Sequence, residues 1–567
     1  MIPAASATQV LTNARVRVLD TADTRAEALC WRDGQLVAVG SGPDVLAAAG
    51  PGAEAVDVGG ATVLPGFVDA HHHGCIAALY GQRLRLRPPE VTDLPSLQRA
   101  LRSASRELEA GQWLIATDWD ELLLAERRAP TRAELDEAVG DRPLMAMHYS
   151  CHRLLANSRA LELAGIGRHT PDPSGGVISR GRGGLPDGLL IERAMSRVES
   201  LARQDALARD AEDFLQRLGK HNRSLTEVGI TRVVDTAVPA DLGALYRAAD
   251  ARGLLLVPTV MLPVSVSGYL EAPWDVLDGS VTGESEGLLT TGPVKLVFDG
   301  APGCSMCLGW WQSAGATLAT FAQCLRQGSL DPVRTMLSVA PRLGRELRSG
   351  IDIYRRDEAR DIVQAATERG FSLAIHAIGN SAIASALDAY EACGARLHDV
   401  GTPRIEHATF LERDAIARVA GLGVTIVAQP HFVTLPAFAS APVIPGLHIT
   451  PLRWLLDAGV RVAGSSDFPV AGFDPLDGIR GAVRRRTPQG EVKDASQCIT
   501  LTEALGLYTR GAAEAAGAGA ACGTLEPGKR ADLVILDGAL ERESDLDSAR
   551  VRATVIGGSV VHGRASP

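Results

Sequence analysis

Three consecutive histidines end a short apolar run in VLPGFVDAHHHG, Val63 to Gly74. Val63–Val68 is predicted to be a strand, and alternate side chains of an extended backbone share a face. His71 and His73 therefore point the same way, whereas His72 points the opposite way. Two imidazoles side by side at a strand end supply half of a metal site. A polar loop with chance histidines is the alternative, so further ligands must be sought elsewhere in the chain.

Further groups of the metal-binding or metal-bridging type lie in or after other predicted strands. Lys295 lies within one strand, His376 and His407 each end one, and Asp467 directly follows another. Parallel strands that form a barrel bring their C-terminal ends to one mouth, where the active sites of such barrels lie. Each residue alone could be an ordinary core or loop residue. Their joint placement favours a single metal centre.

The elements that would position these groups form an alternating pattern. Short apolar runs alternate with helical patterns, as in βα units around a parallel sheet. Eight runs are predicted strands, the number that closes a (β/α)8 TIM barrel: Val63–His71, Thr231–Asp235, Leu254–Val260, Val294–Phe298, Phe371–His376, Arg404–His407, Val424–Gln429 and Arg461–Ser466. Helices are expected at Ile362–Arg369, Ala382–Glu391 and Leu411–Val419.

The two ends of the chain and one long interval fall outside this pattern. Residues 1–62 and 516–567 alternate short apolar runs with turns, and we expect both to build one small β domain around the barrel of residues 63–515. The interval of about residues 79–228 is predicted to be an insertion after the first strand. It carries two further apolar runs, Trp113–Thr117 and Leu144–Tyr149.

Composition limits the classes of function. The chain has 567 residues, of which 46% are hydrophobic and 22% charged, as in soluble globular proteins. A net charge of -10 with scattered basic residues argues against a nucleic-acid partner. The sequence lacks the roughly 20-residue apolar stretch that a membrane span needs and lacks a signal-peptide pattern, so a cytoplasmic protein without a membrane partner is expected. A homo-oligomer stays open.

The nine cysteines are too scattered and odd in number to predict a disulfide framework. Cys304 and Cys307 have the spacing of a redox or zinc pair, but a second pair that would complete four ligands is missing from the sequence. An ordinary loop with two small side chains is the alternative for this segment.

The ordered set of motifs resembles the amidohydrolase superfamily, and more narrowly amidohydrolase family 3, the group that includes N-substituted formamide deformylases. The matching segments are PGFVDAHHHG (Pro65–Gly74), VKLVFDG (Val294–Gly300), AIHAIGN (Ala374–Asn380), IEHA (Ile405–Ala408), GSSDFPV (Gly464–Val470) and EPGKRADLVILD (Glu526–Asp537). The resemblance implies a distorted (β/α)8 barrel, a β-sandwich built from both termini, and one or two divalent metal ions, usually zinc.

The same resemblance assigns roles at the matching positions. It implies that the metal ligands are His71, His73, His376, His407 and Asp467. Lys295 matches the position of a carbamylated lysine that bridges two metals in some relatives. A buried lysine with a lowered pKa supplies the neutral amine that reacts with carbon dioxide. An unmodified lysine paired with an acid such as Asp299 is the alternative.

The expected function is metal-dependent hydrolysis of a non-peptide carbon–nitrogen bond of the amide type in a small molecule. Zinc would make hydroxide available at neutral pH, Asp467 would carry the proton from water to the leaving nitrogen, and His431 would hydrogen-bond the oxyanion. Another reaction of the superfamily, such as deamination, isomerisation or decarboxylation, is one alternative. A metal-binding protein without catalysis is another.

Five further positions carry open assignments. Asn380 stands where many relatives have Asp, which puts a charged role there in doubt. Asp118 and Asp120 are either substrate contacts or solvated loop acids. Trp310 and Trp311 closely follow the Lys295 strand, and they either wall an apolar pocket or pack in the core.

Overall fold

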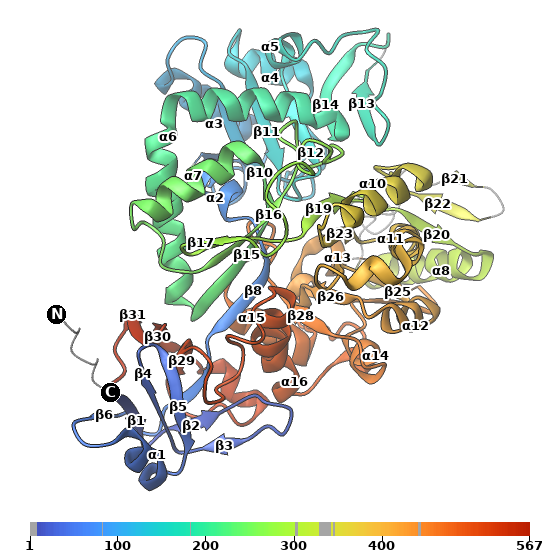
Figure 1. Ribbon diagram of the computed structural model, residues 1–567. Coiled ribbons are helices and arrows are strands. Elements are labelled where there is room, and N and C mark those ends of the chain that lie inside the picture. The colour runs from blue at the N-terminus through green and yellow to red at the C-terminus, as the bar shows by residue number, and fades with distance from the viewer. Residues whose placement is uncertain are drawn as a thin grey trace.

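A computed structural model of the chain describes residues 8–81, 83–181, 183–300, 304–327, 342–343, 346–439, 441 and 444–566. The fold is α/β, with two parallel arrays of strands at its centre (Figure 1). The first array contains β8 (Phe67–His72), β15 (Ile230–Val238), β16 (Thr259–Pro263) and β18 (Leu289–Thr291). The second contains β19 (Val294–Val297), β23 (Leu373–Ala377), β24 (Arg404–His407), β26 (Thr425–Ala428) and β28 (Val462–Gly464). β28 lies beside β8, and β16 lies beside β19.

The predicted first strand is divided in two at Pro65-Gly66. β7 (Thr62–Pro65) pairs with strands from both chain ends, whereas β8 pairs with β15 in the parallel array. Gly66 permits this passage, because a Cβ atom there would lie 2.2 Å from Thr231 Oγ1. The chain therefore passes directly from the terminal sheet into the strand that carries His71.

The predicted strand Leu254–Val260 is displaced in the structure, where β16 begins at Thr259. The Asn222 side chain accepts hydrogen bonds from the backbone N–H groups of Leu256 at 2.7 Å and Val257 at 2.9 Å. Pro258 then offers no N–H to a neighbouring strand. These contacts hold the apolar run as a connecting segment, and the strand starts only after it.

Both ends of the chain contribute to one mixed sheet of six strands, at the lower left of Figure 1. Its order is β3 (Arg25–Ala26), β2 (Arg15–Arg17), β7, β29 (Leu533–Leu536), β30 (Val551–Ile556) and β31 (Ser559–Gly563). A second sheet contains β5 (Gln35–Gly40), β4 (Ala28–Arg32), β1 (Gln9–Thr12) and β6 (Glu54–Asp57). Buried residues from both ends, including Leu11, Trp31 and Leu533, pack in one cluster between them.

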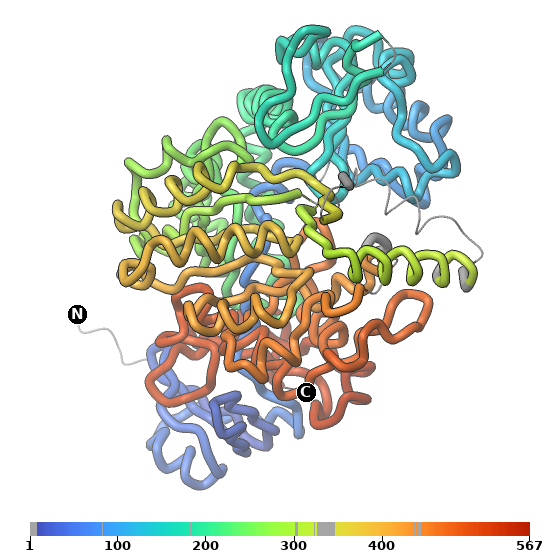
Figure 2. The backbone as a smooth tube through the Cα atoms, turned by 90° about the vertical axis from the view of Figure 1, so that its right-hand side faces the viewer, coloured from blue at the N-terminus to red at the C-terminus, as the bar shows by residue number. Residues whose placement is uncertain are grey.

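The segment between β8 and β15 carries a sheet of its own, which lies above the parallel strands in Figures 1 and 2. The sheet comprises β9 (Leu84–Arg85), β10 (Leu114–Trp119), β11 (Leu144–His148), β12 (Arg153–Ala156), β14 (Pro186–Glu192) and β13 (Gly176–Arg180). The runs predicted at Trp113–Thr117 and Leu144–Tyr149 correspond to β10 and β11. The helix α6 (Ser196–Glu227) then leads back to β15.

Helices occupy the predicted positions in the second half of the chain. The observed helices are α10 (Arg356–Glu368), α11 (Asn380–Cys393) and α12 (Arg413–Leu422). α8 (Trp310–Gln327) extends to the right in Figure 2, and both Trp310 and Trp311 are exposed on it, at 66% and 89%. These tryptophans neither wall a pocket nor pack in the core. Among the described helices, none has both the length and the apolar character that crossing a bilayer requires.

Candidate metal centre

The six residues predicted as metal ligands or bridges line one cavity at the C-terminal ends of the parallel strands: His71, His73, Lys295, His376, His407 and Asp467. Asp467 Oδ1 lies 3.2 Å from His71 Nε2 and 3.1 Å from His73 Nε2. One ligand atom from each of these three residues lies within 4.8 Å of the others. Such a group can hold a divalent cation.

The remaining imidazoles complete the cluster. The ring centroid of His407 lies 4.7 Å from that of His71 and 4.5 Å from that of His376. Burial lowers the pKa of His407 to about 3 and also lowers the pKa values of His73 and His376. These imidazoles are therefore neutral at neutral pH, the state in which a ring nitrogen binds a metal. His376 Nε2 is buried without a hydrogen-bond partner among the described residues.

A buried ion pair orients His71. Glu406 Oε2 lies 2.5 Å from His71 Nδ1, and Glu406 Oε1 accepts from Arg404 Nε at 2.6 Å. Burial alone would raise the pKa of Glu406, but Arg404 and His71 hold it well below its usual range. The carboxylate therefore keeps the proton of His71 on Nδ1 and leaves Nε2 for a metal. Sequence reasoning missed Glu406, although it lies beside His407 in the IEHA motif.

The Nδ1 atoms of His407 and His73 also have partners that fix their rings. His407 Nδ1 lies 2.8 Å from Gln429 Oε1, and the Gln429 amide donates to Ser465 Oγ at 2.9 Å. His73 Nδ1 lies 3.3 Å from Thr236 Oγ1 on β15. Each interaction occupies Nδ1 and leaves Nε2 directed to the cavity. Gln429 also escaped the sequence-based prediction, although it precedes Pro430 in the AQPHF segment that was considered for His431.

Lys295 is buried in the cavity wall, and its Nζ has no hydrogen-bond partner among the described residues. Burial lowers the pKa of its ammonium to about 8, although Glu406 and Asp467 favour the charged form. The alternative partner Asp299 instead accepts the backbone N–H groups of Ser305, Ile378 and Gly379 at 2.8–2.9 Å. With this pKa about a tenth of the Lys295 amine is neutral at pH 7, a much larger fraction than for an exposed lysine.

The backbone holds Asp467 in an uncommon conformation. Its φ is 55°, and its N–H donates to the His71 carbonyl at 2.8 Å. His407 has φ 71° at the end of β24. Non-glycine residues in this left-handed region cost about 1–3 kcal/mol and cluster at functional sites. Burial alone would raise the pKa of Asp467, but His71 and His73 hold it well below its usual range, so the carboxylate is ionised.

The insertion contributes a histidine that the sequence analysis did not select. His152 lines the same cavity, and its Nδ1 lies 2.7 Å from the buried Glu192 carboxylate at the end of β14. Its ring centroid lies 5.0 Å from that of His376. Burial would lower the pKa of His152, but Glu192 raises it above its ordinary value. The available sequence signal was the place of His152 just after the apolar run Leu144–Tyr149.

His72 faces away from the cavity, as strand alternation predicts. Its Nδ1 lies 3.0 Å from Asp69 Oδ2, and its Nε2 lies 2.7 Å from His221 Nε2. Asp69 also accepts the N–H of Ser466 at 2.9 Å and its hydroxyl at 2.5 Å. This set of bonds ties β8 to the segment that carries Asp467.

The structure places His431, which was predicted to contact the oxyanion, beside the segment that carries Asp467. His431 does not line the metal cavity, and its Nε2–H donates to the Ser466 carbonyl at 3.1 Å. It therefore supports the residue before Asp467.

Asn380 has a structural role: its side chain accepts from the Cys307 N–H at 2.9 Å and donates to the Cys307 carbonyl at 2.8 Å. An Asp there would lack the second bond.

The remaining assignments are resolved by local contacts. Cys307 donates to Glu346 at 3.0 Å, and Cys304 is a buried free thiol. Among the described residues this pair forms neither a disulfide nor a metal-binding group.

The two acids of the segment between β8 and β15 are also in contact with neighbouring groups. Asp118 pairs with Arg85 at 2.6 Å. Asp120 is only 5% exposed, which contradicts a solvated loop acid, and it lies with Glu121 and His148 in a second acidic cluster. Arg153 pairs with Glu121 in that cluster.

Comparisons with known proteins identify the family and the fold. Residues 54–562 match the model of the amidohydrolase family. The chain is 33% identical over 541 residues to N-substituted formamide deformylase from Arthrobacter pascens, covering 93% of each chain. A metal-dependent hydrolase from Pyrococcus horikoshii superposes with a TM-score of 0.69 at 22% identity, over 95% of this chain and 99% of that one. Zinc-bound atrazine chlorohydrolase from Arthrobacter aurescens superposes with a TM-score of 0.51 at 15% identity, over 99% and 96%.

These solved structures support the fold, and the family match extends over most of the chain, including every residue of the metal cavity. The chain belongs to the amidohydrolase family.

Proposed function

We propose that this protein is a metal-dependent hydrolase that cleaves a non-peptide carbon–nitrogen bond of the amide type in a small molecule. The observation that carries the proposal is the convergence of His71, His73 and Asp467, with ligand atoms within 4.8 Å of one another, in a cavity that Lys295 also lines. The similarity to an N-substituted formamide deformylase supports this bond type.

The architecture that we propose follows the family. The strands β8, β15, β16, β19, β23, β24, β26 and β28 close into a distorted (β/α)8 barrel within residues 63–515, with the insertion at about 79–228. Residues 1–62 and 516–567 form a β-sandwich. The adjacency of β28 to β8 and of β16 to β19 supports closure, and the pairing of β7 with β2 and β29 supports the joint terminal domain.

The buried donor set fits one or two divalent ions, with zinc as the preferred candidate. The proposed ligands are His71, His73, His376, His407 and Asp467, with a carbamylated Lys295 as a bridge. A bound ion of this kind lowers the pKa of water and polarises a carbonyl oxygen. Neutral imidazoles support the fit, as does Lys295 Nζ, which has no hydrogen-bond partner among the described residues. His376 Nε2 makes no hydrogen bond among these residues either and lies 3.5 Å from Asp299 Oδ1.

The chain's own residues supply the proton transfers. The ionised Asp467 carboxylate accepts the proton of the attacking water and returns it to the leaving nitrogen. Glu406 and Gln429 hold the rings of His71 and His407 in their ligating orientations. His152 approaches from the insertion, and its Nε2 contacts the polar part of the substrate while Nδ1 stays on Glu192.

Metal analysis of the purified, unchelated protein tests the premise. We expect at least about one equivalent of zinc, manganese or iron per chain, and less than about half an equivalent would contradict the proposal.

A panel of N-formyl, N-acyl, carbamate and cyclic imide compounds then tests the bond type. Activity only on substrates of deamination, isomerisation or decarboxylation would show that the protein catalyses one of those reactions instead of amide hydrolysis. A metal-loaded protein that is inactive on both sets of compounds would be a metal-binding protein without catalysis.

A further inference from the structure

The helix α8 presents its large apolar side chains to solvent at the edge of the molecule (Figures 1 and 2). Besides Trp310 and Trp311, these are Leu318, Phe321 and Leu325, which are 72%, 60% and 86% exposed. At 3.6 residues per turn, all five fall within an arc of about 100° on one side of the helix. They form one continuous surface, which we call the apolar stripe. Single exposed apolar residues are ordinary, whereas a contiguous patch marks an interaction site.

The opposite side of α8 holds the helix on the body of the protein. Ala316 lies there and is buried. Gly315 lies close to the segment before β27 (Leu447–Ile449), because a Cβ atom on Gly315 would be 2.6 Å from Pro445 Cγ. Gln312 Nε2 donates to Glu412 Oε1 at 3.0 Å. Small residues therefore face the body, and the helix is held in place with its large apolar side chains outside.

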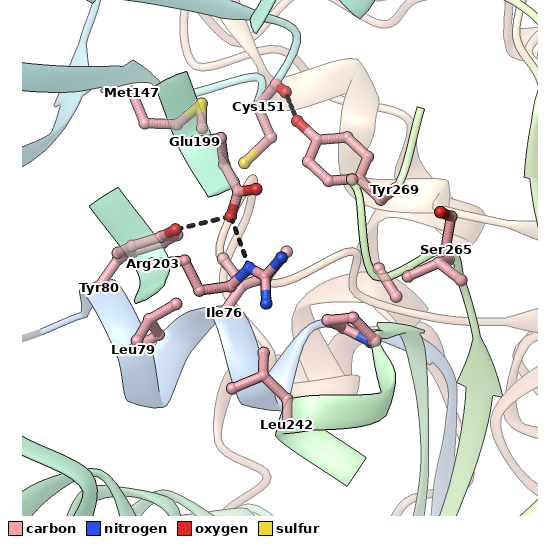
Figure 3. A pocket seen from close by; sticks show the side chains of 14 residues that line it. Ile76, Leu79, Tyr80, Met147, Cys151, Glu199, Arg203, Leu242, Ser265 and Tyr269 are labelled. Atoms are coloured by element: carbon pink, nitrogen blue, oxygen red, sulfur yellow. Dashed lines mark hydrogen bonds and ion pairs between the residues drawn. The ribbon is translucent and has the colours of Figure 1, made fainter. Parts of the chain in front are cut away.

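Other helices of the chain have the reverse arrangement. Leu79 of α2 (Gly74–Tyr80) and Leu242 of α7 (Ala240–Ala251) are 1% and 2% exposed, and Figure 3 shows them with Met147 around a small interior cavity. Burial of one such side chain stabilises a protein by about 1.5–3 kcal/mol. A single copy of the chain does not gain this free energy from the apolar stripe of α8.

The absence of charge from α8 indicates what kind of surface can cover the stripe. The sixteen residues from Trp310 to Leu325 contain no Asp, Glu, Lys, Arg or His, whereas the 22% charged content of the chain would place three or four there. Helices that bind membrane surfaces typically carry Lys and Arg on their polar face, and a charged protein partner requires complementary charges. The stripe instead fits another uncharged apolar surface, and two copies of it can meet without like-charge repulsion.

The spacing of the stripe suits pairing with its own copy. Trp311, Leu318 and Leu325 are seven residues apart, with Ala314 and Phe321 between them, which is the a and d spacing of a helix that packs along another helix. Leu318 lies midway between Trp311 and Leu325. A two-fold axis at Leu318 would therefore place the Trp311 end of one helix against the Leu325 end of an antiparallel copy.

The area of the stripe also meets the need of a dimer. An aromatic side chain buries roughly 150–250 Å², and the free energy of burying a leucine corresponds to roughly 100 Å². With the exposed fractions of its five residues, the stripe offers about 600 Å² of apolar surface. Two copies would bury about 1,200 Å² in total, which is the lower end of the range for stable protein–protein interfaces.

We propose that the apolar stripe of α8 is the contact surface of a homodimer, in which the α8 helices of two copies pack antiparallel across a two-fold axis at Leu318. The inference goes beyond the proposed hydrolase function and does not depend on it. Trp310 and Trp311, which are exposed in one copy, are then covered by the other.

Sedimentation velocity of the full-length protein over a range of concentrations tests the dimer. At about 20 µM the wild type should sediment as a species of twice the 59.6 kDa chain mass. Leu318→Glu should weaken the dimer at least about 100-fold, because it brings two carboxylates together in an apolar contact. Leu46→Glu on α1 (Gly42–Ala49), which alters another exposed leucine, is the matched control and should leave the dimer intact. A monomeric wild type, or a dimer that Leu318→Glu does not weaken, overturns the inference.

Opposite charges at Leu318 test the two-fold axis itself. Leu318→Glu and Leu318→Lys should each be monomeric alone, whereas an equimolar mixture should associate at least about tenfold more tightly than either, because the two charges then face each other. A mixture that associates no better than its components overturns the inference. Monomeric wild type that binds vesicles of phosphatidylcholine and phosphatidylglycerol, with loss of binding in Leu318→Glu, would assign the stripe to a lipid surface and also overturn it.

Discussion

Glu406 Oε2 lies 2.5 Å from His71 Nδ1, and this contact joins β24 to β8 at the metal cavity. The same carboxylate is bound by Arg404, whose guanidinium also donates to the Ala70 carbonyl at 2.6 Å. The Arg404–Glu406 pair on β24 therefore orients a proposed ligand on another strand, β8. Residues that orient metal ligands typically contribute about 10–100-fold to metal affinity or activity.

Glu406→Gln should lower metal affinity and kcat/KM by about 10–100-fold, because a neutral amide no longer fixes the His71 proton on Nδ1. Metal titration of the apoprotein and steady-state kinetics measure both effects. Glu391→Gln, which alters a partly exposed partner of Arg418, is the matched control. Wild-type metal affinity in Glu406→Gln would show that His71 needs no such support.

Asp467→Asn should lower kcat by about 10²–10⁴-fold, because the amide cannot accept the proton of water. The substitution keeps the size of the side chain, so the left-handed backbone at Asp467 is retained. Kinetics on the substrate found in the amide panel give the readout, with circular dichroism to verify folding. Hydrolysis at the wild-type rate would exclude the proposed proton transfer.

His152→Ala should lower kcat/KM by about 100-fold while leaving the bound metal unchanged, because His152 is placed at the substrate and not among the proposed ligands. His448→Ala is a suitable control, since His448 bonds Asp494 away from the cavity. Elemental analysis accompanies the kinetics. Loss of metal in parallel with activity would instead identify His152 as a ligand.

The convergence of the proposed ligands on one cavity could be predicted from the sequence. The residues that hold their rings in place could not, for a physical reason. Strand periodicity and the common mouth of parallel strands place His71, His376 and His407 without coordinates. The bond from Glu406 to His71 depends on how two strands distant in sequence lie across the cavity. The approach of His152 depends on how the insertion packs over the strand ends, which local patterns do not encode.

Contacts between residues distant in sequence also explain where the predicted fold differs from the structure. The displaced strand at Leu254–Val260 results from a long-range contact, because the Asn222 side chain on α6 takes the N–H groups that a strand would have used. Trp310 and Trp311 closely follow the Lys295 strand in the sequence, and they were predicted either to wall an apolar pocket or to pack in the core. They are exposed, since the helix that carries them extends away from the body of the protein.

Carbamylation of Lys295 should depend on pH in a defined direction. Burial lowers the pKa of its amine to about 8, so the neutral fraction of the amine is about tenfold larger at pH 9 than at pH 7. At equal concentrations of ¹³C-bicarbonate, the apoprotein should therefore hold more carbamate at equilibrium at pH 9 than at pH 7, visible as a ¹³C NMR signal that Lys295→Met lacks. A bare ammonium in the electron density of the metal-loaded enzyme would exclude the bridge.

His221 should make stability fall with acid. Burial, followed by the nearby His72, lowers the pKa of His221 to about 3, below the value of about 6.5 in an unfolded chain. Between these values the unfolded state binds more protons, so stability is fully present above about pH 6.5 and declines as the pH falls toward 3. From pH 8 to pH 5 this group alone should remove up to about 2 kcal/mol from the free energy of unfolding.

His221→Phe isolates that contribution, because a neighbouring ring, Phe468, stacks on His221 with a centroid distance of 5.3 Å and can stack on Phe as well. Urea unfolding at pH 8 and pH 5 gives the free energies, and the difference between wild type and variant is compared at the two pH values. Buried histidines that do not contact His221 titrate in both proteins and cancel, whereas His72, whose Nε2 lies 2.7 Å from His221 Nε2, contributes to the difference. The wild type should lose more stability than the variant as the pH falls, and an equal loss would mean that His221 is not held neutral by the fold.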